Sequence, residues 1–114
     1  MDQFKEIIDA YISNYNSFEK CKISFDCDYG ELIFNKENDN CLTIYGIYIF
    51  PKHRNKGLCR EILHYSIEQC TNKFKYFCVQ SVLSKVLYNY LLRFKYKDKK
   101  FKNISSGFIY YINN

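Results

Sequence analysis

An apolar segment that runs directly into a proline, a basic loop and an amphipathic helix constrains this chain more than any other feature. Residues 41–50, CLTIYGIYIF, are apolar on both alternating faces, which is typical of a strand covered on both sides. Pro51 has no backbone N–H and therefore ends the hydrogen-bonding ladder of that strand. Apolar residues then recur at steps of three and four from Leu58 to Cys70, which predicts a helix over about 57–72.

A second mostly apolar strand completes this unit. Its sequence, KYFCVQSVL, covers residues 75–83 and follows the helix after a short polar link. A strand, a helix and a strand in this order form a βαβ crossover, so the two strands are predicted to be near-parallel neighbours. Gly46, in the middle of the first strand, indicates a bulge or a close backbone approach.

The flanking segments predict further elements around this unit. Apolar spacing predicts an N-terminal helix over 2–17 and a third helix over 84–94. Alternation predicts strands over 20–28 and 31–36, joined by a turn at Tyr29–Gly30, and a closing strand over 107–112. The closing strand is expected to pair with a segment near 99–104, and 95–103 is interpreted as a basic connector. The chain is therefore predicted to be a single α/β domain over 1–114 with a mixed central sheet.

Composition limits the environment and the ligands. The chain has 114 residues, a formal net charge of +5 and six cysteines, with no CxxC spacing and only two histidines. No zinc pattern follows from these spacings, so no metal is expected. The N-terminus lacks the features of a signal peptide and no apolar run is long enough for a membrane span, which predicts a cytoplasmic, reducing environment. The positive charge favours anionic ligands.

The basic loop between the first central strand and its helix is the strongest candidate site. The first turn of a helix has backbone N–H groups without intrahelical partners, and an anion there is stabilised by several of them together. Gly57 would let a phosphate approach without a Cβ in the way. Lys52, Arg54, Lys56 and Arg60 add positive charge around the same place. From these residues alone, a pyrophosphate site and an ordinary turn with solvated lysines remain alternatives.

The segment IYIFPKHRNKGLCREIL resembles the acyl-CoA-binding motif of the GNAT acetyltransferase superfamily. Ile49-Phe50-Pro51 corresponds to the V-x-P end of the family's central strand. Residues 54–59, RNKGLC, correspond to the R-x-x-G-x-G/A segment, with Cys59 in place of the last small residue. The resemblance implies a GNAT-like fold with a splayed pair of parallel strands and helices on both faces of the sheet.

The same resemblance implies the cosubstrate and the residues that hold it. Acetyl-CoA would lie between the two parallel strands, with its pantetheine amides paired to the backbone of Ile47, Tyr48 and Ile49. Its diphosphate would be held by the loop and the start of the helix, at Arg54, Asn55, Lys56, Gly57, Leu58, Cys59 and Arg60. No covalent enzyme intermediate is needed, so Cys59 is interpreted as a small packing residue.

The catalytic groups are less well defined than the cosubstrate site. Members of the family commonly use a tyrosine on the third helix as the general acid for the CoA thiolate. Neither alignment of residues 84–96 with the family pattern places a tyrosine at that position, so Tyr90 and Tyr88 are both candidates. The central strand carries no carboxylate that would serve as the family's usual base. Tyr45 and Tyr48 on that strand are interpreted as packing aromatics, and Glu31 as a further candidate base.

The resemblance implies an N-acetyltransferase that moves an acetyl group from acetyl-CoA to a primary amine by direct attack. The acceptor is expected to be a small-molecule or peptide amine, and the elements missing from the N-terminal part favour a homodimer that completes the site. Two alternatives remain: a CoA-binding module without catalysis, and a basic nucleic-acid-binding domain suggested by the lysine-rich segment 95–102. A nucleic-acid partner and a membrane partner are not expected.

Overall fold

The predicted βαβ unit forms the centre of the fold. In the computed structural model, β3 (Cys41–Ile49) is followed by α2 (Leu58–Cys70) and β4 (Tyr76–Gln80). The two strands run parallel, with Cα partners from Cys41 opposite Tyr76 to Ile44 opposite Val79. Pro51 opens a short 3-10 turn, η2 (Pro51–His53), directly after β3, as its missing N–H requires. The prediction of a parallel strand pair joined by a helix is therefore confirmed.

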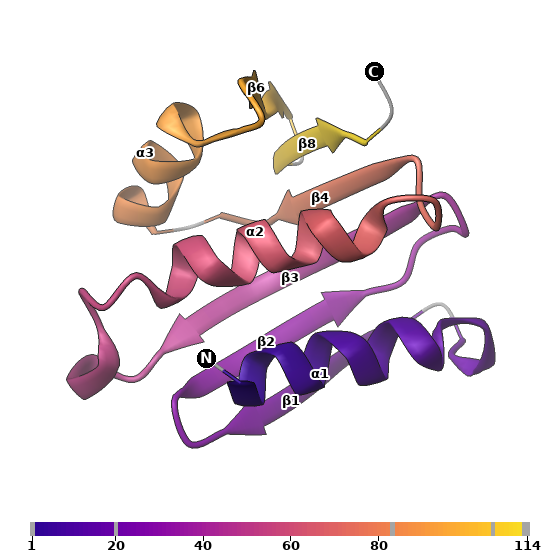
Figure 1. Ribbon diagram of the computed structural model, residues 1–114, viewed down its shortest axis with the longest axis horizontal. Coiled ribbons are helices and arrows are strands. Elements are labelled where there is room, and N and C mark those ends of the chain that lie inside the picture. Colours follow the sequence, from indigo (N-terminus) through magenta and orange to yellow (C-terminus); the bar gives the residue numbers. More distant parts are fainter. Residues whose placement is uncertain (1, 20, 83, 106, 113–114) are drawn as a thin grey trace.

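The remaining strands extend this pair into one mixed sheet, and the structure describes residues 2–19, 21–82, 84–105 and 107–112. β1 (Lys22–Cys27) and β2 (Gly30–Asn35) form an antiparallel hairpin beside β3, while β8 (Gly107–Tyr111) and β7 (Lys102–Ile104) continue the sheet beyond β4. The resulting strand order is β1-β2-β3-β4-β8-β7 (Figure 1). Residues 20 and 83, where two strands were expected to begin and end, lie outside the described residues.

Three α-helices accompany the sheet: α1 (Asp2–Ser13), α2 and α3 (Lys85–Arg93), with a 3-10 turn η1 (Tyr15–Ser17) after α1. Ser84 caps α3, because its Oγ accepts a hydrogen bond of 3.3 Å from the backbone N–H of Leu87. Figure 1 shows α1 and α2 side by side over one face of the sheet. No helix within the described segments is long and apolar enough to cross a membrane.

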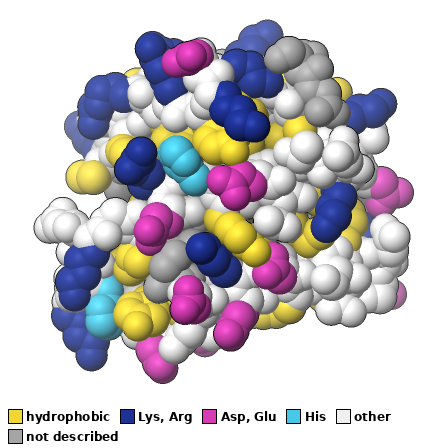
Figure 2. Space-filling view, viewed as in Figure 1, with side chains coloured by type: hydrophobic (Ala, Val, Ile, Leu, Met, Phe, Trp, Pro, Cys, Tyr) yellow, Lys and Arg dark blue, Asp and Glu magenta, His cyan; other side chains and the backbone are white. Residues whose placement is uncertain are grey.

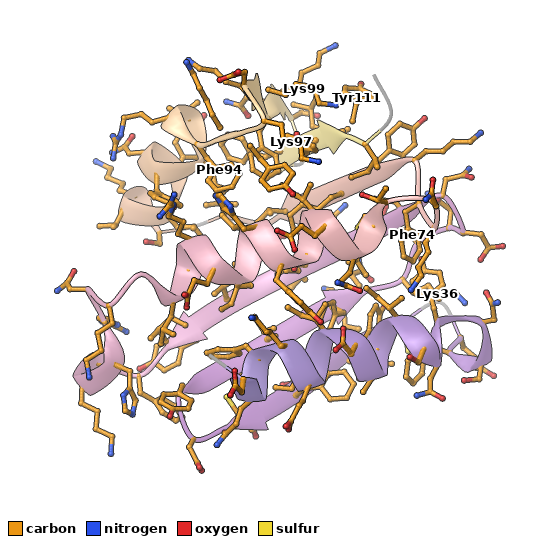
Figure 3. The ribbon with its side chains drawn as sticks, viewed as in Figure 1. Lys36, Phe74, Phe94, Lys97, Lys99 and Tyr111 are labelled. Carbon is orange, nitrogen blue, oxygen red and sulfur yellow. The ribbon has the colours of Figure 1, made fainter. Side chains whose placement is uncertain are left out.

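The expectation of helices on both faces is wrong for α3, which lies on the same face as α2. Phe94, at the end of α3, contacts the ring of His64 on α2 at 5.3 Å between centroids, and Figure 3 shows it reaching towards α2. On the other side of α3, Tyr88 packs at 5.2 Å on Phe108, whose strand partner Val79 is buried in the same core. These aromatic contacts determine the face of the sheet on which α3 packs. The spacing of apolar residues within α3 does not indicate that face.

Aromatic stacking holds α1 onto the first half of the sheet. Tyr11 is fully buried and stacks on Phe34 of β2, with 4.0 Å between ring centroids and an interplanar angle of 9°. Ile44 lies opposite Phe34 in β3 and is also fully buried, so one apolar layer continues from α1 across the central strands. Burial of such rings is the main stabilising contribution of the N-terminal helix.

The basic segment expected to be a connector forms a small hairpin. Lys95–Tyr96 (β5) pairs antiparallel with Lys99–Lys100 (β6). The turn residues Lys97 and Asp98 both adopt left-handed backbone angles, with φ of 50° and 62°, as a type I′ hairpin turn requires. The sequence lacks the usual Asn-Gly or Asp-Gly signal at this turn, so the hairpin was not predicted. Lys99 Nζ also donates to the backbone carbonyl of Tyr111 at the C-terminal end of β8 (Figure 3).

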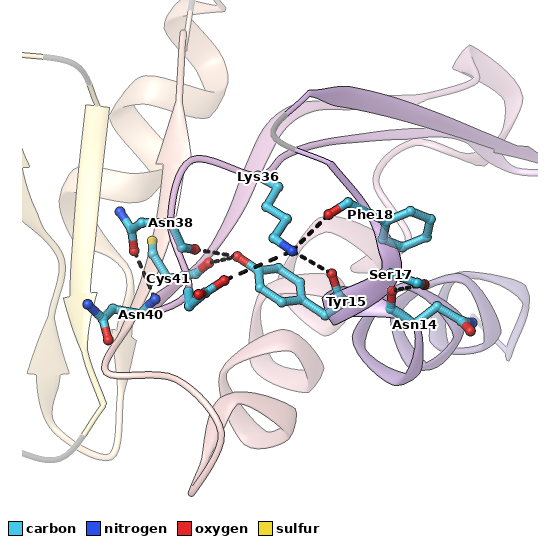
Figure 4. A network of polar contacts seen from close by, with 9 residues as sticks. Asn14, Tyr15, Ser17, Phe18, Lys36, Asn38, Asn40 and Cys41 are labelled. Atoms are coloured by element: carbon cyan, nitrogen blue, oxygen red, sulfur yellow. Dashed lines mark hydrogen bonds and ion pairs between the residues drawn. The ribbon is translucent and has the colours of Figure 1, made fainter.

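A buried lysine fixes the start of β3 (Figure 4). Lys36 is only 8% exposed, and its Nζ donates hydrogen bonds to the carbonyl oxygens of Tyr15 at 2.7 Å and Phe18 at 2.9 Å. The Tyr15 hydroxyl lies 2.6 Å from the carbonyl oxygen of Asn38 and 2.8 Å from that of Cys41. These contacts join the segment after α1 to the first residue of β3, and burial raises the pKa of Tyr15.

Replacing Lys36 by Met should remove the ammonium donor while the aliphatic stem is kept. The carbonyl groups of Tyr15 and Phe18 would then be buried without their partner, which typically costs about 1–3 kcal/mol. We expect a Lys36→Met variant to unfold at lower urea concentration than the wild type, with an unchanged slope of the transition. Lys73→Met, at an exposed site, is the matched control. Equal midpoints for Lys36→Met and the wild type would contradict the role given to the network.

Candidate active site

The two central parallel strands separate into a fork. Their pairing ends where Ile44 lies opposite Val79, and β4 stops at Gln80. β3 continues to Ile49, and over this part its partner in the described sheet is β2 alone. The edge of β3 that faces the fork therefore carries backbone N–H and C=O groups without a strand partner. Such an edge binds an extended chain that contains amide groups, in the manner of an added strand.

A β-bulge opens the fork at its base. Ile33 of β2 pairs with Gly46 and Phe34 pairs with Ile44, which leaves Tyr45 as an extra residue on β3. A bulge of this kind bends its strand and increases the local twist, so it turns the second half of β3 away from β4. The irregularity predicted at Gly46 is therefore present, and the additional residue is its neighbour Tyr45.

The loop after β3 leads into a helix N-terminus that no side chain caps. Asn55 and Gly57 adopt left-handed backbone angles, with φ of 63° and 78°, and Gly57 is the N-cap of α2. A Cβ added at Gly57 would meet no atom within 4 Å, so open space lies beside the first turn. The first-turn N–H groups at this end have no intrahelical acceptor. The backbone and the space together fit the diphosphate group for which the sequence motif is typical.

Positive side chains surround this helix end, but they are not equally placed. Figure 2 shows Lys and Arg side chains with a histidine at the end of the molecule where the loop lies. Lys52, Lys56 and Arg60 are exposed there. Arg54 instead folds back on β3, because its Nε donates a 2.8 Å hydrogen bond to the Ile49 carbonyl and its guanidinium lies 5.3 Å from the centroid of the Tyr48 ring. In this structure Arg54 therefore closes the end of β3.

The two histidines pack against aromatic rings. His53 lies edge-on to Tyr29 at 4.7 Å, and burial together with the charges of Lys56 and Lys52 lowers the pKa of its imidazole. His64 lies between Phe94 and Tyr96, and burial followed by the charge of Arg60 lowers its pKa. Among the described residues, no three His, Cys, Asp or Glu side chains come together as metal ligands would.

Cys59 lies in the first turn of α2 and is partly buried against the core. Burial raises the pKa of its thiol to about 11, so the thiol stays protonated at neutral pH. A helix N-terminus favours the thiolate, but here desolvation is the larger effect. This environment suits a packing residue and opposes a role as a nucleophile.

The thiol environments predict a clear order of reactivity with iodoacetamide. Cys21 is exposed and should be alkylated at neutral pH, whereas Cys59 should react slowly because the thiolate is the reactive form. The rate at Cys59 should rise as the pH approaches about 11. Peptide mass spectrometry of the native protein measures both sites in one experiment. Rapid alkylation of Cys59 at neutral pH would show that the thiol is activated.

The two candidate tyrosines of α3 point in different directions, as residues two apart on a helix must. Tyr90 is half-buried, and burial followed by the nearby Cys59 raises the pKa of its phenol, while the charge of Arg60 opposes the shift. Tyr88 faces β7 and β8, and its hydroxyl accepts a 2.7 Å hydrogen bond from Nδ2 of Asn103. Of the two phenols, Tyr90 is therefore the one beside the loop and the helix end.

A pocket of about 580 Å³ opens on the Tyr88 side of α3, beyond the end of β4. The described residues that line it carry no ionised side chain: Ser81, Val82, Tyr88, Asn103, Ile104, Ser105, Gly107 and Phe108. Its polar groups are hydroxyls and one amide, so it suits a ligand with neutral hydrogen-bonding groups. The sequence motifs did not indicate this pocket, because its lining comes from the segment after β4, from α3 and from the β7–β8 hairpin.

The candidate base Glu31 lies on the far side of β2 from the fork. It is opposite Asp26 of β1 and Tyr48 of β3, and its carboxylate accepts a 2.5 Å hydrogen bond from Ser24. The phenol of Tyr45, in contrast, lies near Ser81 and beneath the ammonium group of Lys22. These two partners come from opposite sides of the fork and were not among the candidate residues of the sequence.

Comparison with known proteins gives one match. The family model described as Acetyltransferase (GNAT) family matches residues 29–86, just over half of the chain. The matched part contains β2, β3, the loop, α2 and β4, which together build the fork and the uncapped helix end. Searches of the curated proteins and of the solved structures found no match.

Proposed function

Because the chain belongs to the GNAT acetyltransferase family, we propose that it transfers an acetyl group from acetyl-CoA to a primary amine by direct attack on the thioester. The observation that carries this proposal is the open space at Gly57, in front of first-turn N–H groups that no side chain caps. That space lies just beyond the unpaired edge of β3. An anionic diphosphate and an amide-containing chain are thus accommodated by adjacent parts of one continuous segment.

In this proposal the chain binds acetyl-CoA mainly through its backbone. The N–H groups at the start of α2 donate to the diphosphate, and the exposed side chains of Lys56 and Arg60 balance its charge. The backbone of Ile47, Tyr48 and Ile49 pairs with the pantetheine amides as a strand partner would. A backbone N–H of the same edge then polarises the thioester carbonyl and stabilises the oxyanion that forms during attack.

Tyr90 is the general acid of this proposal. Its pKa is affected by Cys59 and Arg60, which belong to the first turn of α2, and this supports a place for the phenol near the thiolate that leaves. Burial raises its pKa above the ordinary value, so the proton needed by the leaving thiolate is present throughout the neutral range. The neutral pocket beyond β4 receives the body of the acceptor, and Tyr88 and Asn103 offer it hydrogen bonds.

Two measurements test the function directly. Acetyl-CoA should raise the melting temperature of the protein, with a stabilisation that grows as the logarithm of its concentration once this exceeds the dissociation constant. Release of free thiol from acetyl-CoA should then depend on adding a primary amine. Binding without amine-dependent release would indicate a CoA-binding module without catalysis. Stabilisation by oligonucleotides alone, lost steeply with salt, would favour a nucleic-acid-binding domain instead.

Two substitutions at Gly57 separate the space beside the helix from the backbone angle. Leu and Asn have similar size, but only Asn adopts the left-handed conformation with little strain. We expect both Gly57→Leu and Gly57→Asn to lose the thermal stabilisation by acetyl-CoA, since either side chain fills the space that a Cβ enters freely. Gly57→Asn should keep the melting temperature of the unliganded protein. Normal acetyl-CoA affinity in both variants would contradict the proposed diphosphate site.

Replacing the α3 tyrosines one at a time distinguishes their roles. Tyr90→Phe should lower kcat by about 10- to 100-fold with little change in acetyl-CoA affinity, because it removes a proton donor that acts in the transition state. Tyr88→Phe should mainly raise the KM for the amine, since its hydroxyl lies in the pocket. Steady-state kinetics with both substrates varied measure these effects. An unchanged kcat for Tyr90→Phe would exclude this residue as the acid.

A further inference from the structure

A tyrosine at the base of the fork has contacts that its role as a packing residue does not explain. Tyr45 is the extra residue of the β3 bulge, directly after the last residue that pairs with β4. Its neighbour Ile44 is fully buried beneath the helices, whereas Tyr45 is half-exposed. Because successive strand residues face opposite sides, the Tyr45 phenol lies on the face away from Ile44, at the place where the two parallel strands separate.

Two residues from different strands hold this phenol. Ser81, which follows the last residue of β4, lies beside the Tyr45 hydroxyl on the β4 side of the fork. Ser81 adopts a left-handed backbone angle with φ of 52°, an uncommon conformation for a serine. From the other side, Lys22 of β1 reaches across β2 and places Nζ 3.8 Å from the centroid of the Tyr45 ring.

These contacts favour the ionised phenol. Hydrogen bonds from Ser81 and Lys22, and the charge of Lys22, lower the pKa of Tyr45. The direction is opposite to that at Tyr90, whose pKa burial raises. A group that accepts a proton needs surroundings that favour its charged form, as the surroundings of Tyr45 do.

We propose that Tyr45, held by Lys22 and Ser81, is the proton acceptor for the amine in acetyl transfer. This inference rests on the proposed acetyltransferase function. The ammonium form of the acceptor loses one proton to the Tyr45 phenolate, and the neutral amine then attacks the thioester carbon. The C–N bond forms, the C–S bond breaks, and the sulfur takes its electron pair. A second nitrogen proton replaces the one that Tyr90 gives to the sulfur, so the products are an amide and a free thiol.

The position of the pocket supports this assignment. Ser81 lies beside Tyr45 and also lines the pocket beyond β4, so an acceptor in that pocket that contacts Ser81 would be close to the phenol. The carboxylate of Glu37, which contacts Gln80 at the end of β4, is already engaged, because its Oε1 accepts hydrogen bonds from Asn35 at 3.0 Å and Gln80 at 2.7 Å. Lys22 adds positive charge at the fork, so a monoamine with neutral hydroxyl or amide groups suits the site better than a polyamine does.

The test compares Tyr45→Phe with Tyr76→Phe, which removes a hydroxyl from the neighbouring strand β4. Tyr45→Phe should lower kcat/KM for an alkylamine about 100-fold, the usual size of a general-base contribution, and should keep the thermal stabilisation by acetyl-CoA. Lys22→Met should also lower kcat/KM for the alkylamine, and Tyr76→Phe should leave this kcat/KM unchanged. If Tyr45→Phe does not fold, the Lys22→Met result decides, since Lys22 is on the exposed edge strand.

An acceptor that needs no base distinguishes a catalytic role of Tyr45 from a structural one. Loss of a structural role would affect both kinds of acceptor equally. An alkoxyamine is already neutral at neutral pH, so Tyr45→Phe should reduce its acetylation much less than that of an alkylamine. Equal losses with both acceptors, or no loss with either, would overturn the role of Tyr45 while the wild-type activity still supports the proposed function. A wild-type protein that binds acetyl-CoA but acetylates neither amine would overturn both.

Discussion

The geometry of the candidate site depends on the point at which β3 and β4 stop pairing. Up to Ile44 and Val79 the two strands share a regular parallel ladder, and beyond it the bulge at Tyr45 directs β3 away. An unpaired edge inside a sheet carries polar backbone groups that need partners, and in most sheets a neighbouring strand supplies them. In the described part of this sheet, the edge of β3 beyond Ile44 has no strand partner on the side of β4, and β3 leads through its loop to the uncapped start of α2.

The rest of the fold keeps this opening in place. Tyr11 stacks on Phe34 and fixes α1 over β2, immediately beside the bulge. At the other end of β3, Lys36 and Tyr15 hold its first residue through backbone carbonyl groups. The aromatic contacts of Phe94 and Tyr88 attach α3 to α2 and to β8. Each of these contacts joins elements that would otherwise move independently around the fork.

Much of this arrangement was predictable because its causes are local. Pro51 ends a strand, and Gly57 adopts a left-handed angle at the start of a helix. Apolar residues alternate in the strands and recur at steps of three and four in the helices, so their spacing distinguishes the two. The side on which α3 packs was not predictable, because it depends on contacts such as Phe94 with His64 between distant segments. The β5–β6 hairpin was missed because Lys97 and Asp98 adopt left-handed angles without a glycine. The contacts of Tyr45 were missed for a related reason, since Lys22 and Ser81 approach it only in three dimensions.

The β3 bulge also has a consequence for how such a site can arise. Side chains alternate between the two faces of a strand, so one inserted residue reverses the face of everything beyond it relative to an uninterrupted register. Here the bulge absorbs that reversal, because Leu42 and Ile44 before it and Ile47 and Ile49 after it all pack towards the core. Removing one residue at this point would therefore keep the same core face along β3 but would remove the bulge that directs the strand away from β4. Loss of a single residue is thus sufficient to restore a continuous strand there.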